Sequence, residues 1–436
     1  MNRKETGMTG MMKTMKKPAR RWISLLAGFV LLACSFAAAE GPDMEEELDL
    51  KDVLNLEDLE DDIEETRILA PGESLKASDL AWHTPSEGSP VQCSHENCYW
   101  NLPLGTYDDE AVWKVLTSPL TVLSGNQRQQ IKIRKEPDAA CTEYTGEVTG
   151  ESQGVHVLER GEEWTLIEAY SSSTEGSKVK VYAEKFQGYV ETSLLKEVEV
   201  DQTCGVVIDK QKQRLYVYRD GKRWAELLCS TGFNTKKKKP WQETPAGEFL
   251  CISWTGDFSL KNDDGEIYMW CKKAIRINDG ILIHEVPLMQ DKDGNWTYDQ
   301  CERFLGEKAS HGCIRVQRQA NINGVNHEWL WKNLSDGSVR GKQPTKVIIW
   351  DDRDRTLGYP DDGLTLYYNP SKHAQYYHAT PTCSTYVKED GTHPEMEPFL
   401  YSQLDESPFS RLKPCPCCCP EPRKPVIDEL NEENNR

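Results

Sequence analysis

The stretch Ser310-His311-Gly312-Cys313-Ile314-Arg315 places a cysteine directly after a His-Gly step. A second histidine, His284, ends the upstream apolar run Gly280-Ile-Leu-Ile-His284. A cysteine thiol becomes a good nucleophile at neutral pH only where a base or a positive field favours the thiolate. The sequence offers two histidines for that role, so Cys313 is the candidate nucleophile of an enzyme.

Other short motifs precede this stretch in a fixed order: Val206-Val-Ile-Asp209, Gln213-Arg-Leu-Tyr-Val-Tyr218, Ser230-Thr-Gly232, Thr244-Pro-Ala-Gly247-Glu-Phe249 and Leu305-Gly306. Together with His284, they resemble the catalytic family of the L,D-transpeptidases (the YkuD-type domain) over roughly residues 203–351. His-Gly-Cys alone would indicate little, whereas the ordered set indicates this family.

The resemblance implies that Cys313 attacks a peptide carbonyl and forms a thioester. His284 would take the thiol proton, and the backbone carbonyl of Glu285 would fix the tautomer of its imidazole. Outside this set of motifs, Cys313 would more often be a paired or buried cysteine, and His284 a core histidine.

The other residues of the stretch have supporting roles in this interpretation. His311 would shape the turn and polarise the site, and Ser310 would form a hydrogen bond within the turn. The backbone N–H groups of Gly312 and Cys313 are candidates for an oxyanion hole, and glycine permits the tight backbone geometry this requires. Arg315 would hold a substrate carboxylate with its planar guanidinium.

Residues 285–309 separate His284 from Ser310, a longer spacing than this family usually has. The surplus lies near Met289-Gln-Asp-Lys-Asp-Gly-Asn-Trp296, whose Asp, Gly and Asn content is typical of a surface hairpin. We expect an insertion here, in a flap over the site.

The resemblance also implies a substrate. Such an enzyme cleaves the bond between the L-centre of diaminopimelate and the terminal D-alanine of a peptidoglycan tetrapeptide stem, and passes the acyl group to an amine of another stem. This chemistry needs no metal or organic cofactor. Two alternatives stay open: an L,D-carboxypeptidase that uses water as acceptor, and a wall-binding protein without activity.

The N-terminus has the pattern of a secretory signal peptide. Residues 1–39 carry seven basic side chains and one acidic one, and an uncharged apolar run over residues 22–39 ends in Ala37-Ala-Ala39. We expect export and cleavage after this run. A lipid anchor at Cys34, in the imperfect lipobox Leu31-Leu-Ala-Cys34, and an uncleaved anchor helix are the alternatives. Contact with a membrane is expected only through this segment.

The chain is acidic, with a formal net charge of −19, which becomes −25 without residues 1–39. Residues 40–65 contain fourteen acidic residues and one lysine, a composition that favours a disordered linker. The acidity argues against a nucleic-acid partner, because such partners require basic surfaces.

Short alternating segments follow at spacings of roughly ten residues. They are Ile131–Pro137, Val155–Leu158, Trp164–Ile167, Lys178–Tyr182 and Gly188–Val190. This section resembles a bacterial SH3 domain, a small β-barrel that commonly binds peptidoglycan; a spacer barrel without a ligand is the alternative.

Cysteines gather in two further places. Cys93 and Cys98 favour a local disulfide, with a metal site that includes His95 as the alternative. Near the C-terminus, His378, Cys383, Cys415 and Cys418 supply four ligands for a structural zinc ion, and disulfides or free thiols are the alternative there.

We therefore predict a mainly β protein, with a mixed-sheet catalytic domain and a helix from about Gln317 through Leu334. The expected order along the chain is a signal peptide (1–39), an acidic linker (40–67), a Cys-containing connecting segment (68–120), an SH3-like domain (121–200), an L,D-transpeptidase domain (201–351), a hinge (352–364), a Cys/His-rich module (365–420) and a polar tail (421–436).

Overall fold

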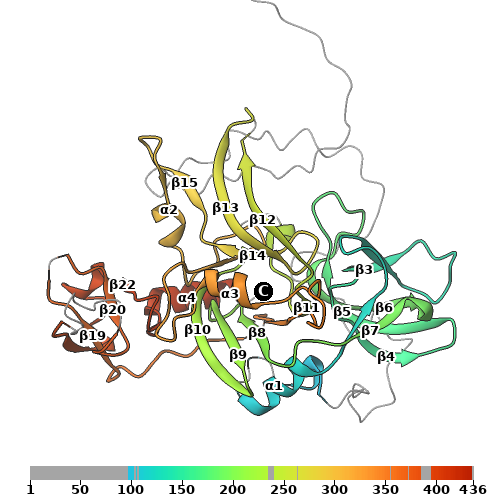
Figure 1. Ribbon diagram of the computed structural model, residues 1–436, viewed down its shortest axis with the longest axis horizontal. Coiled ribbons are helices and arrows are strands. Elements are labelled where there is room, and N and C mark those ends of the chain that lie inside the picture. Colours follow the sequence, from blue (N-terminus) through green and yellow to red (C-terminus); the bar gives the residue numbers. More distant parts are fainter. Residues whose placement is uncertain are drawn as a thin grey trace, which may run out of the picture. The chain divides into compact units, whose positions relative to one another are not determined.

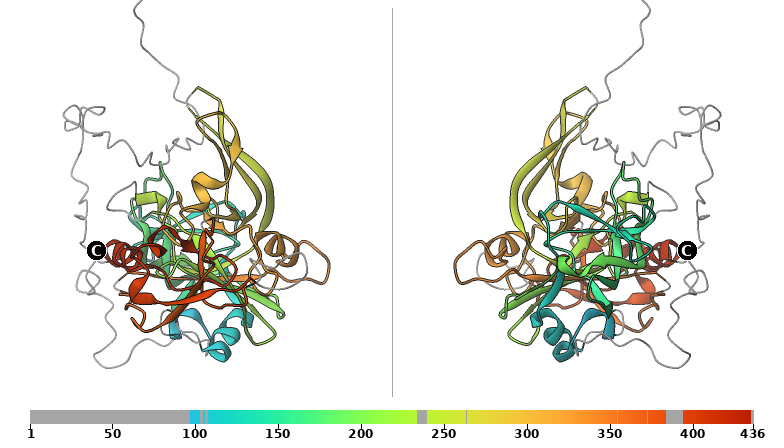
Figure 2. Two further views of the ribbon diagram at one scale, coloured as in Figure 1. Left: turned by 90° about the vertical axis from the view of Figure 1, so that its left-hand side faces the viewer. Right: turned by 90° about the vertical axis from the view of Figure 1, so that its right-hand side faces the viewer.

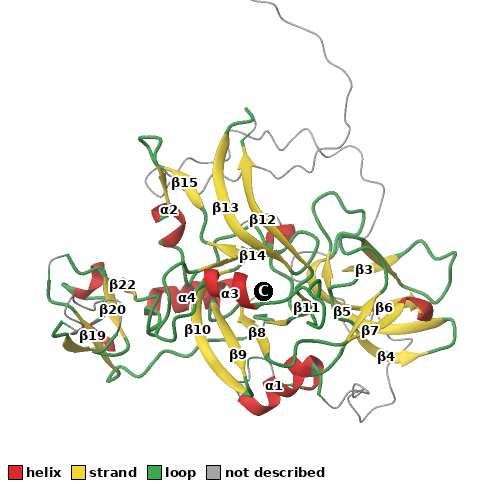
Figure 3. Ribbon diagram, viewed as in Figure 1, coloured by secondary structure: helices red, strands yellow, loops and turns green. Residues whose placement is uncertain are grey.

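The structure is a computed structural model that describes residues 97–102, 105, 108–233, 240–262, 264–353, 355–371, 373–383 and 394–434. The predicted signal peptide with Cys34, the acidic linker, Cys93 and His95 lie outside these residues. Strands predominate, as Figure 3 shows. In the part of the chain that the structure describes, no helix has the length and apolar character needed to cross a membrane.

The largest sheet has eleven strands in the order β11-β18-β8-β9-β10-β17-β14-β13-β15-β16, with β12 paired to β13. Figure 1 labels its strands from β8 to β15. Two neighbouring pairs, β18 with β8 and β14 with β17, are parallel, so the sheet is mixed as predicted. The strands are β8 (Cys204–Asp209), β9 (Arg214–Arg219), β10 (Lys222–Ser230), β11 (Gly247–Leu250), β12 (Ser253–Lys261), β13 (Ile267–Arg276), β14 (Leu282–Glu285), β15 (Leu288–Gln290), β16 (Trp296–Thr297), β17 (Ile314–Val316) and β18 (Lys346–Trp350).

Alternation along the strands divides the apolar residues between two faces of this sheet. Val206, Ile208 and Leu215 belong to a core on one face, which also contains Leu330 of helix α3 (His327–Asn333). Val207 and Tyr216 belong to a second core on the other face, which also contains Val112, Val115 and Leu116 of helix α1 (Asp109–Thr117). Both faces are therefore covered, which explains why β8 is buried along its whole length.

Helix α3 is shorter than the predicted helix over 317–334. Its N-terminus is fixed by Asn326, whose side chain accepts a hydrogen bond from the Trp329 N–H at 3.0 Å. The preceding residues form turns, in which Asn321 accepts hydrogen bonds from the backbone N–H groups of Asn323 and Val325. Trp329 and Trp331 pack against the core.

Strands β12 and β13 form a long ribbon that extends from the sheet (Figure 2). β15 pairs with the outer part of β13, where Met289 lies opposite Met269. β15 and β16 form the hairpin expected after His284, and the short helix α2 (Asp299–Glu302) follows it. The inserted residues therefore continue the sheet at its edge.

Residues 130–191 form a five-stranded antiparallel sheet in the order β3-β2-β6-β5-β4. Its strands are β2 (Gln130–Arg134), β3 (Tyr144–Thr149), β4 (His156–Arg160), β5 (Trp164–Ser172) and β6 (Tyr182–Glu191), and the flanking strands β1 (Leu120–Leu123) and β7 (Leu195–Val198) pair separately. The sequence did not predict β3, and the strand expected from Lys178 begins only at Tyr182. Ile133, Val148 and Ile167 are wholly buried between the strands.

The C-terminal module contains a four-stranded sheet in the order β21-β19-β20-β22. These strands are β19 (Thr365–Tyr368), β20 (Tyr376–His378), β21 (Glu397–Leu400) and β22 (Lys413–Pro414). Where a polar tail was expected, residues Lys424–Asn434 form helix α4, because Ile427 and Leu430 share a buried face. Short 3-10 helices are η3 (Tyr99–Asn101), η4 (Thr192–Leu194), η5 (Pro240–Gln242), η7 (Tyr401–Gln403) and η8 (Phe409–Arg411).

Candidate active site

The parallel pair β14 and β17 brings the two ends of the motif together. His284 lies opposite Arg315, and Ile283 lies opposite Ile314. Both isoleucines belong to the buried core, so His284 and Arg315 lie on the other face of these strands. Cys313 directly precedes β17, and its thiol donates a long hydrogen bond to the Gly280 carbonyl, with an Sγ to oxygen distance of 3.7 Å. The strand pairing thus gathers residues that the sequence keeps almost thirty positions apart.

The imidazole of His284 has a defined orientation and tautomer. Its Nδ1 lies 2.7 Å from the backbone carbonyl oxygen of Glu285. A carbonyl oxygen can only accept, so Nδ1 carries the hydrogen and Nε2 keeps its lone pair. The ring is buried, and its edge meets the Phe258 ring with a centroid distance of 6.0 Å. His284 is therefore held as a potential base.

The surroundings of His284 and Cys313 favour the neutral form of each side chain. Burial lowers the pKa of His284 to about 3, and the charge of Arg315 acts in the same direction. Burial raises the pKa of the Cys313 thiol above its usual value, while a backbone hydrogen bond from Leu282 and the charges of Arg315 and Arg276 act against this rise. At neutral pH these shifts favour a neutral thiol at Cys313 and a neutral imidazole at His284.

The turn before β17 is closed by its own side chains. Ser310 is buried, and its hydroxyl donates to the carbonyl of Cys313 and accepts from the Gly312 N–H at 3.2 Å. Gly312 has a φ of 115°, and a Cβ there would lie 2.9 Å from Cδ1 of Ile281. The positive φ therefore requires glycine here, whereas the terminal methyl group of Ile281 could move aside for a Cβ. The Gly312 N–H is therefore engaged within the turn.

The loop that contains Thr244 forms hydrogen bonds that hold this turn in place. The Thr244 hydroxyl donates to the Gly312 carbonyl at 2.7 Å and accepts from the Gly232 N–H at 2.8 Å. A Cβ at Gly232 would lie 2.1 Å from the Gln242 carbonyl oxygen, so the loops approach too closely for any side chain. Thr244 belongs to one of the motifs that indicate the family, but the sequence alone did not predict this role.

A buried ion cluster supports the same loops. It consists of Lys210, Lys308, Glu243, Asp351 and Asp352. Lys210 Nζ lies 3.1 Å from Glu243, 3.2 Å from Asp352 and 3.0 Å from the Thr244 carbonyl oxygen. Lys308 also contacts Asp352, whose pKa the two lysines hold far below its usual value against the effect of burial. Asp352 therefore anchors the start of a segment that the sequence predicted to be a hinge.

Arg315 and His311 flank Cys313 in the sequence. Arg315 is buried, and no carboxylate of the described residues forms an ion pair with its guanidinium. His311 is half-buried, and its ring centroid lies 5.9 Å from that of Phe233. Arg315 is thus a cation available to an anionic group, and His311 contributes to the wall of the turn.

The inserted segment also contacts the site. Tyr298, between β16 and α2, donates a hydrogen bond to a carboxylate oxygen of Glu285 at 3.0 Å and accepts one from Lys272 at 3.0 Å. The guanidinium of Arg318 stacks on the Tyr298 ring at 3.5 Å. The insertion is therefore connected to the residue that follows His284.

The four predicted metal ligands lie together in the C-terminal module. The ligand atoms of His378, Cys383, Cys415 and Cys418 all lie within 4.8 Å of one another. Three of the residues are buried and Cys418 is half-buried. This cluster can hold a structural metal ion.

Comparison with known protein families agrees with the geometry. Residues 205–349 match the family model described as "YkuD: L,D-transpeptidase catalytic domain". The match contains Cys313, His284 and both loops that hold the turn. This part of the chain belongs to the L,D-transpeptidase catalytic-domain family. No match was found among curated proteins.

Solved structures with similarity include an L,D-transpeptidase from Mycobacterium smegmatis, at 15% identity and a TM-score of 0.25, covering 54% of this chain and 92% of the other. The catalytic domain of the E. faecium L,D-transpeptidase acylated by ertapenem has 22% identity and a TM-score of 0.22, covering 35% and 98%. L,D-transpeptidase 1 of Mycobacterium tuberculosis has 15% identity and a TM-score of 0.22, covering 38% and 76%. The family assignment rests on the match of residues 205–349 to the family model.

Proposed function

We propose that this protein is an exported peptidoglycan L,D-transpeptidase. One observation supports the proposal most strongly. Cys313 and His284 lie at neighbouring parallel strands, and the Glu285 carbonyl leaves Nε2 of His284 as the acceptor of a proton. A nucleophile, a base and a group that orients the base are the parts that covalent acyl transfer requires.

In the first half of the reaction, Sγ of Cys313 attacks the carbonyl carbon at the L-centre of the stem's diaminopimelate. The thiol proton passes to Nε2 of His284, and the Cys313 N–H stabilises the developing oxyanion. Collapse of the tetrahedral intermediate breaks the bond to the terminal D-alanine. The leaving amine takes the proton from His284, and a thioester remains on Cys313.

In the second half, an amine of another stem attacks the thioester. Its proton passes to His284, the new amide forms, and Cys313 leaves as a thiolate that recovers the proton. Arg315 would bind a carboxylate of the donor stem, because a buried guanidinium prefers an anionic partner with a planar, bidentate geometry. No organic or metal cofactor takes part in these steps.

The other parts of the chain would serve the same substrate. The sheet over residues 130–191 would be an SH3-like module that binds peptidoglycan, and the N-terminal segment would direct export to the cell wall. Residues 68–120 would connect the acidic linker to this module. Peptidoglycan stem peptides are then the partners of the whole chain.

The proposal is tested by incubating the purified protein with disaccharide-tetrapeptide and analysing the products by mass spectrometry. Cross-linked dimers that disappear with Cys313→Ala support the transpeptidase. Tripeptide without dimers would assign an L,D-carboxypeptidase instead. Recovery of unchanged tetrapeptide, with binding to peptidoglycan sacculi retained, would favour a wall-binding protein without activity.

A further inference from the structure

We propose that His378, Cys383, Cys415 and Cys418 bind one zinc ion, and that the metal-loaded module holds the catalytic strand β17 in place through Gln317. The proposal concerns the folding of the site and does not depend on which acyl acceptor the enzyme uses.

Two separations between ligand atoms of the cluster fit tetrahedral coordination. The Sγ atoms of Cys383 and Cys415 lie 3.6 Å apart, and Sγ of Cys418 lies 3.7 Å from Nδ1 of His378. With Zn–S and Zn–N bonds of about 2.3 and 2.1 Å, the edges of a tetrahedron are about 3.6–3.8 Å. A disulfide would require about 2.05 Å between sulfur atoms. The distances therefore suit a shared cation better than a disulfide.

The strand pairing explains why the ligands meet. β20 and β22 are parallel, with Tyr377 opposite Pro414, so the next residues, His378 and Cys415, emerge side by side. Backbone N–H groups point at the sulfur atoms, from Ala379 to Cys418 at 3.3 Å and from Cys417 to Cys415 at 3.4 Å. Such N–H groups stabilise thiolates, which are the form that binds metal.

Binding of zinc changes the protonation of the ligands and the charge of the site. Three thiols release three protons as they become thiolates, and the imidazole binds in its neutral form. The site then has a net charge of −1 with Zn²⁺. Four protein ligands in a buried site leave no open coordination position, which is typical of structural zinc.

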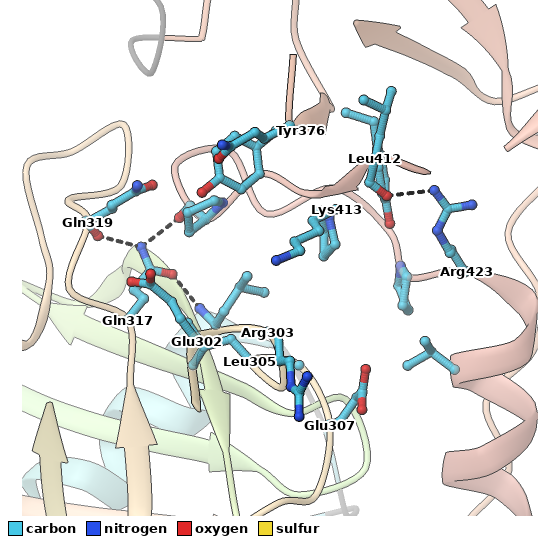
Figure 4. Close-up of a pocket in the computed structure, with 18 of the residues that line it drawn as sticks. Glu302, Arg303, Leu305, Glu307, Gln317, Gln319, Tyr376, Leu412, Lys413 and Arg423 are labelled. Carbon is cyan, nitrogen blue, oxygen red and sulfur yellow. Dashed lines mark hydrogen bonds between the residues drawn. The ribbon is translucent and has the colours of Figure 1, made fainter. Parts of the chain in front are cut away.

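The segment that carries these ligands rests directly on the catalytic sheet. Gln317, the residue after β17, is wholly buried, and its side-chain oxygen accepts a hydrogen bond from the Leu228 N–H at 2.6 Å. Its side-chain nitrogen donates to the Pro416 carbonyl at 2.6 Å and to the Gln319 carbonyl at 2.7 Å (Figure 4). One side chain thus joins β10, β17 and the Cys415–Cys418 loop.

Neighbouring contacts extend this interface. The Ile322 N–H donates to the Cys417 carbonyl at 3.0 Å, and the guanidinium of Arg214 donates to the Pro420 carbonyl at 3.3 Å. A cavity of about 240 Å³ lies beside Gln317 and is lined by both parts, including Tyr376 and Lys413 of the module (Figure 4). The loop that binds metal is therefore part of the support of β17, whose first residue follows Cys313.

Zinc content tests the ligands. The full-length protein, purified without chelators, should contain one zinc ion per chain by mass spectrometry of the metal, and Cys418→Ala should lose it. Cys419→Ala is the matched control and should keep the metal, because Cys419 lies in the same loop but its thiol donates to the Glu226 and Pro416 carbonyls. A protein that lacks zinc and contains a Cys383–Cys415 disulfide would overturn the proposal.

Hydrogen exchange tests the contact with β17. Removing zinc with a chelator should accelerate exchange of the amides of residues 314–317 and Leu228 by about tenfold or more, while strands β2 to β6 stay unchanged. Gln317→Leu should keep zinc and still accelerate exchange at β17. Unchanged exchange at β17 after complete removal of zinc would show that the module is independent of the site.

Discussion

The Thr244 hydroxyl donates a hydrogen bond to the carbonyl oxygen of Gly312 at 2.7 Å, and this bond ties the loop before β11 to the turn that carries Cys313. The same hydroxyl accepts from the Gly232 N–H. The turn that carries Cys313 is thus held by two loops that are distant from it in sequence. Each hydrogen bond of a buried group contributes about 1 kcal/mol, and an orphaned partner costs about 1–3 kcal/mol.

Thr244→Val should displace the turn without changing the volume of the side chain. We expect kcat of the transpeptidase to fall by roughly tenfold to a hundredfold, because small displacements of a nucleophile are costly. Thr244→Ser keeps the hydroxyl and is the matched control. Equal kcat values for the valine and serine variants would show that the hydrogen bond does not position Cys313.

Arg315 should govern recognition of the donor stem through its charge. Arg315→Met should raise KM by roughly tenfold or more, because a charge-assisted hydrogen bond is worth about 1.5–3 kcal/mol. Arg315→Lys keeps the charge but loses the planar fork, so it should recover only part of the affinity. Stems in which one carboxylate at a time is amidated identify the carboxylate that Arg315 binds. The stem that lacks this carboxylate should have the same raised KM with the native enzyme and with Arg315→Met. If Arg315→Met raised KM to the same extent for every amidated stem, Arg315 would not bind a carboxylate of the stem.

The buried histidines should make the fold sensitive to acid. Burial lowers the pKa of His327 from 6.5 to about 4, and its Nε2 donates to the Lys273 carbonyl at 2.8 Å. Between these pH values the unfolded chain binds a proton that the folded chain does not, so stability falls as pH decreases through this window. The lowered pKa of His284 likewise makes stability fall as the pH decreases, down to about pH 3.

Urea unfolding at pH 7.5 and pH 4.5 measures this effect. His327→Gln can keep the hydrogen bond to Lys273 but does not titrate. Because two units separate 6.5 from pH 4.5, at 1.36 kcal/mol per unit, it should reduce the loss of stability by up to about 2.7 kcal/mol. If this variant lost as much stability on acidification as the native protein, His327 would not be buried in its neutral form.

Asp352 should be the most sensitive member of the buried ion cluster. Asp352→Asn leaves the buried ammonium groups of Lys210 and Lys308 without their shared carboxylate, and we expect a loss of about 3–5 kcal/mol of stability. Denaturant titration measures it. Glu110→Gln breaks the exposed ion pair with Lys114 and should change little. Similar effects of both substitutions would contradict the burial of the cluster.

Much of the site could be predicted from the sequence because its chemistry lies in short motifs. His284 and residues 310–315 have distinctive residue types, and the apolar alternation around them predicts strands. The metal cluster was predictable for the same reason, since histidine and cysteine spacings indicate ligands.

The supporting residues could not be predicted, because nothing local distinguishes them. Lys210 and Asp352 look like solvated charges, and only the fold brings them together and excludes water. Gln317 looks like the first residue of a helix, yet its amide joins three segments. The limits of α3 depend on the cap at Asn326, which local pattern did not indicate.

The central claim is that Cys313 carries a covalent acyl group. Intact-protein mass spectrometry after rapid mixing with tetrapeptide stems measures this directly. We expect an adduct with the mass of the stem without its terminal D-alanine, and hydroxylamine should release it. The adduct should be absent from Cys313→Ala and should form at least about a hundredfold more slowly in His284→Gln. A native protein that releases D-alanine without any adduct on Cys313, or a Cys313→Ala variant that remains active, would contradict it.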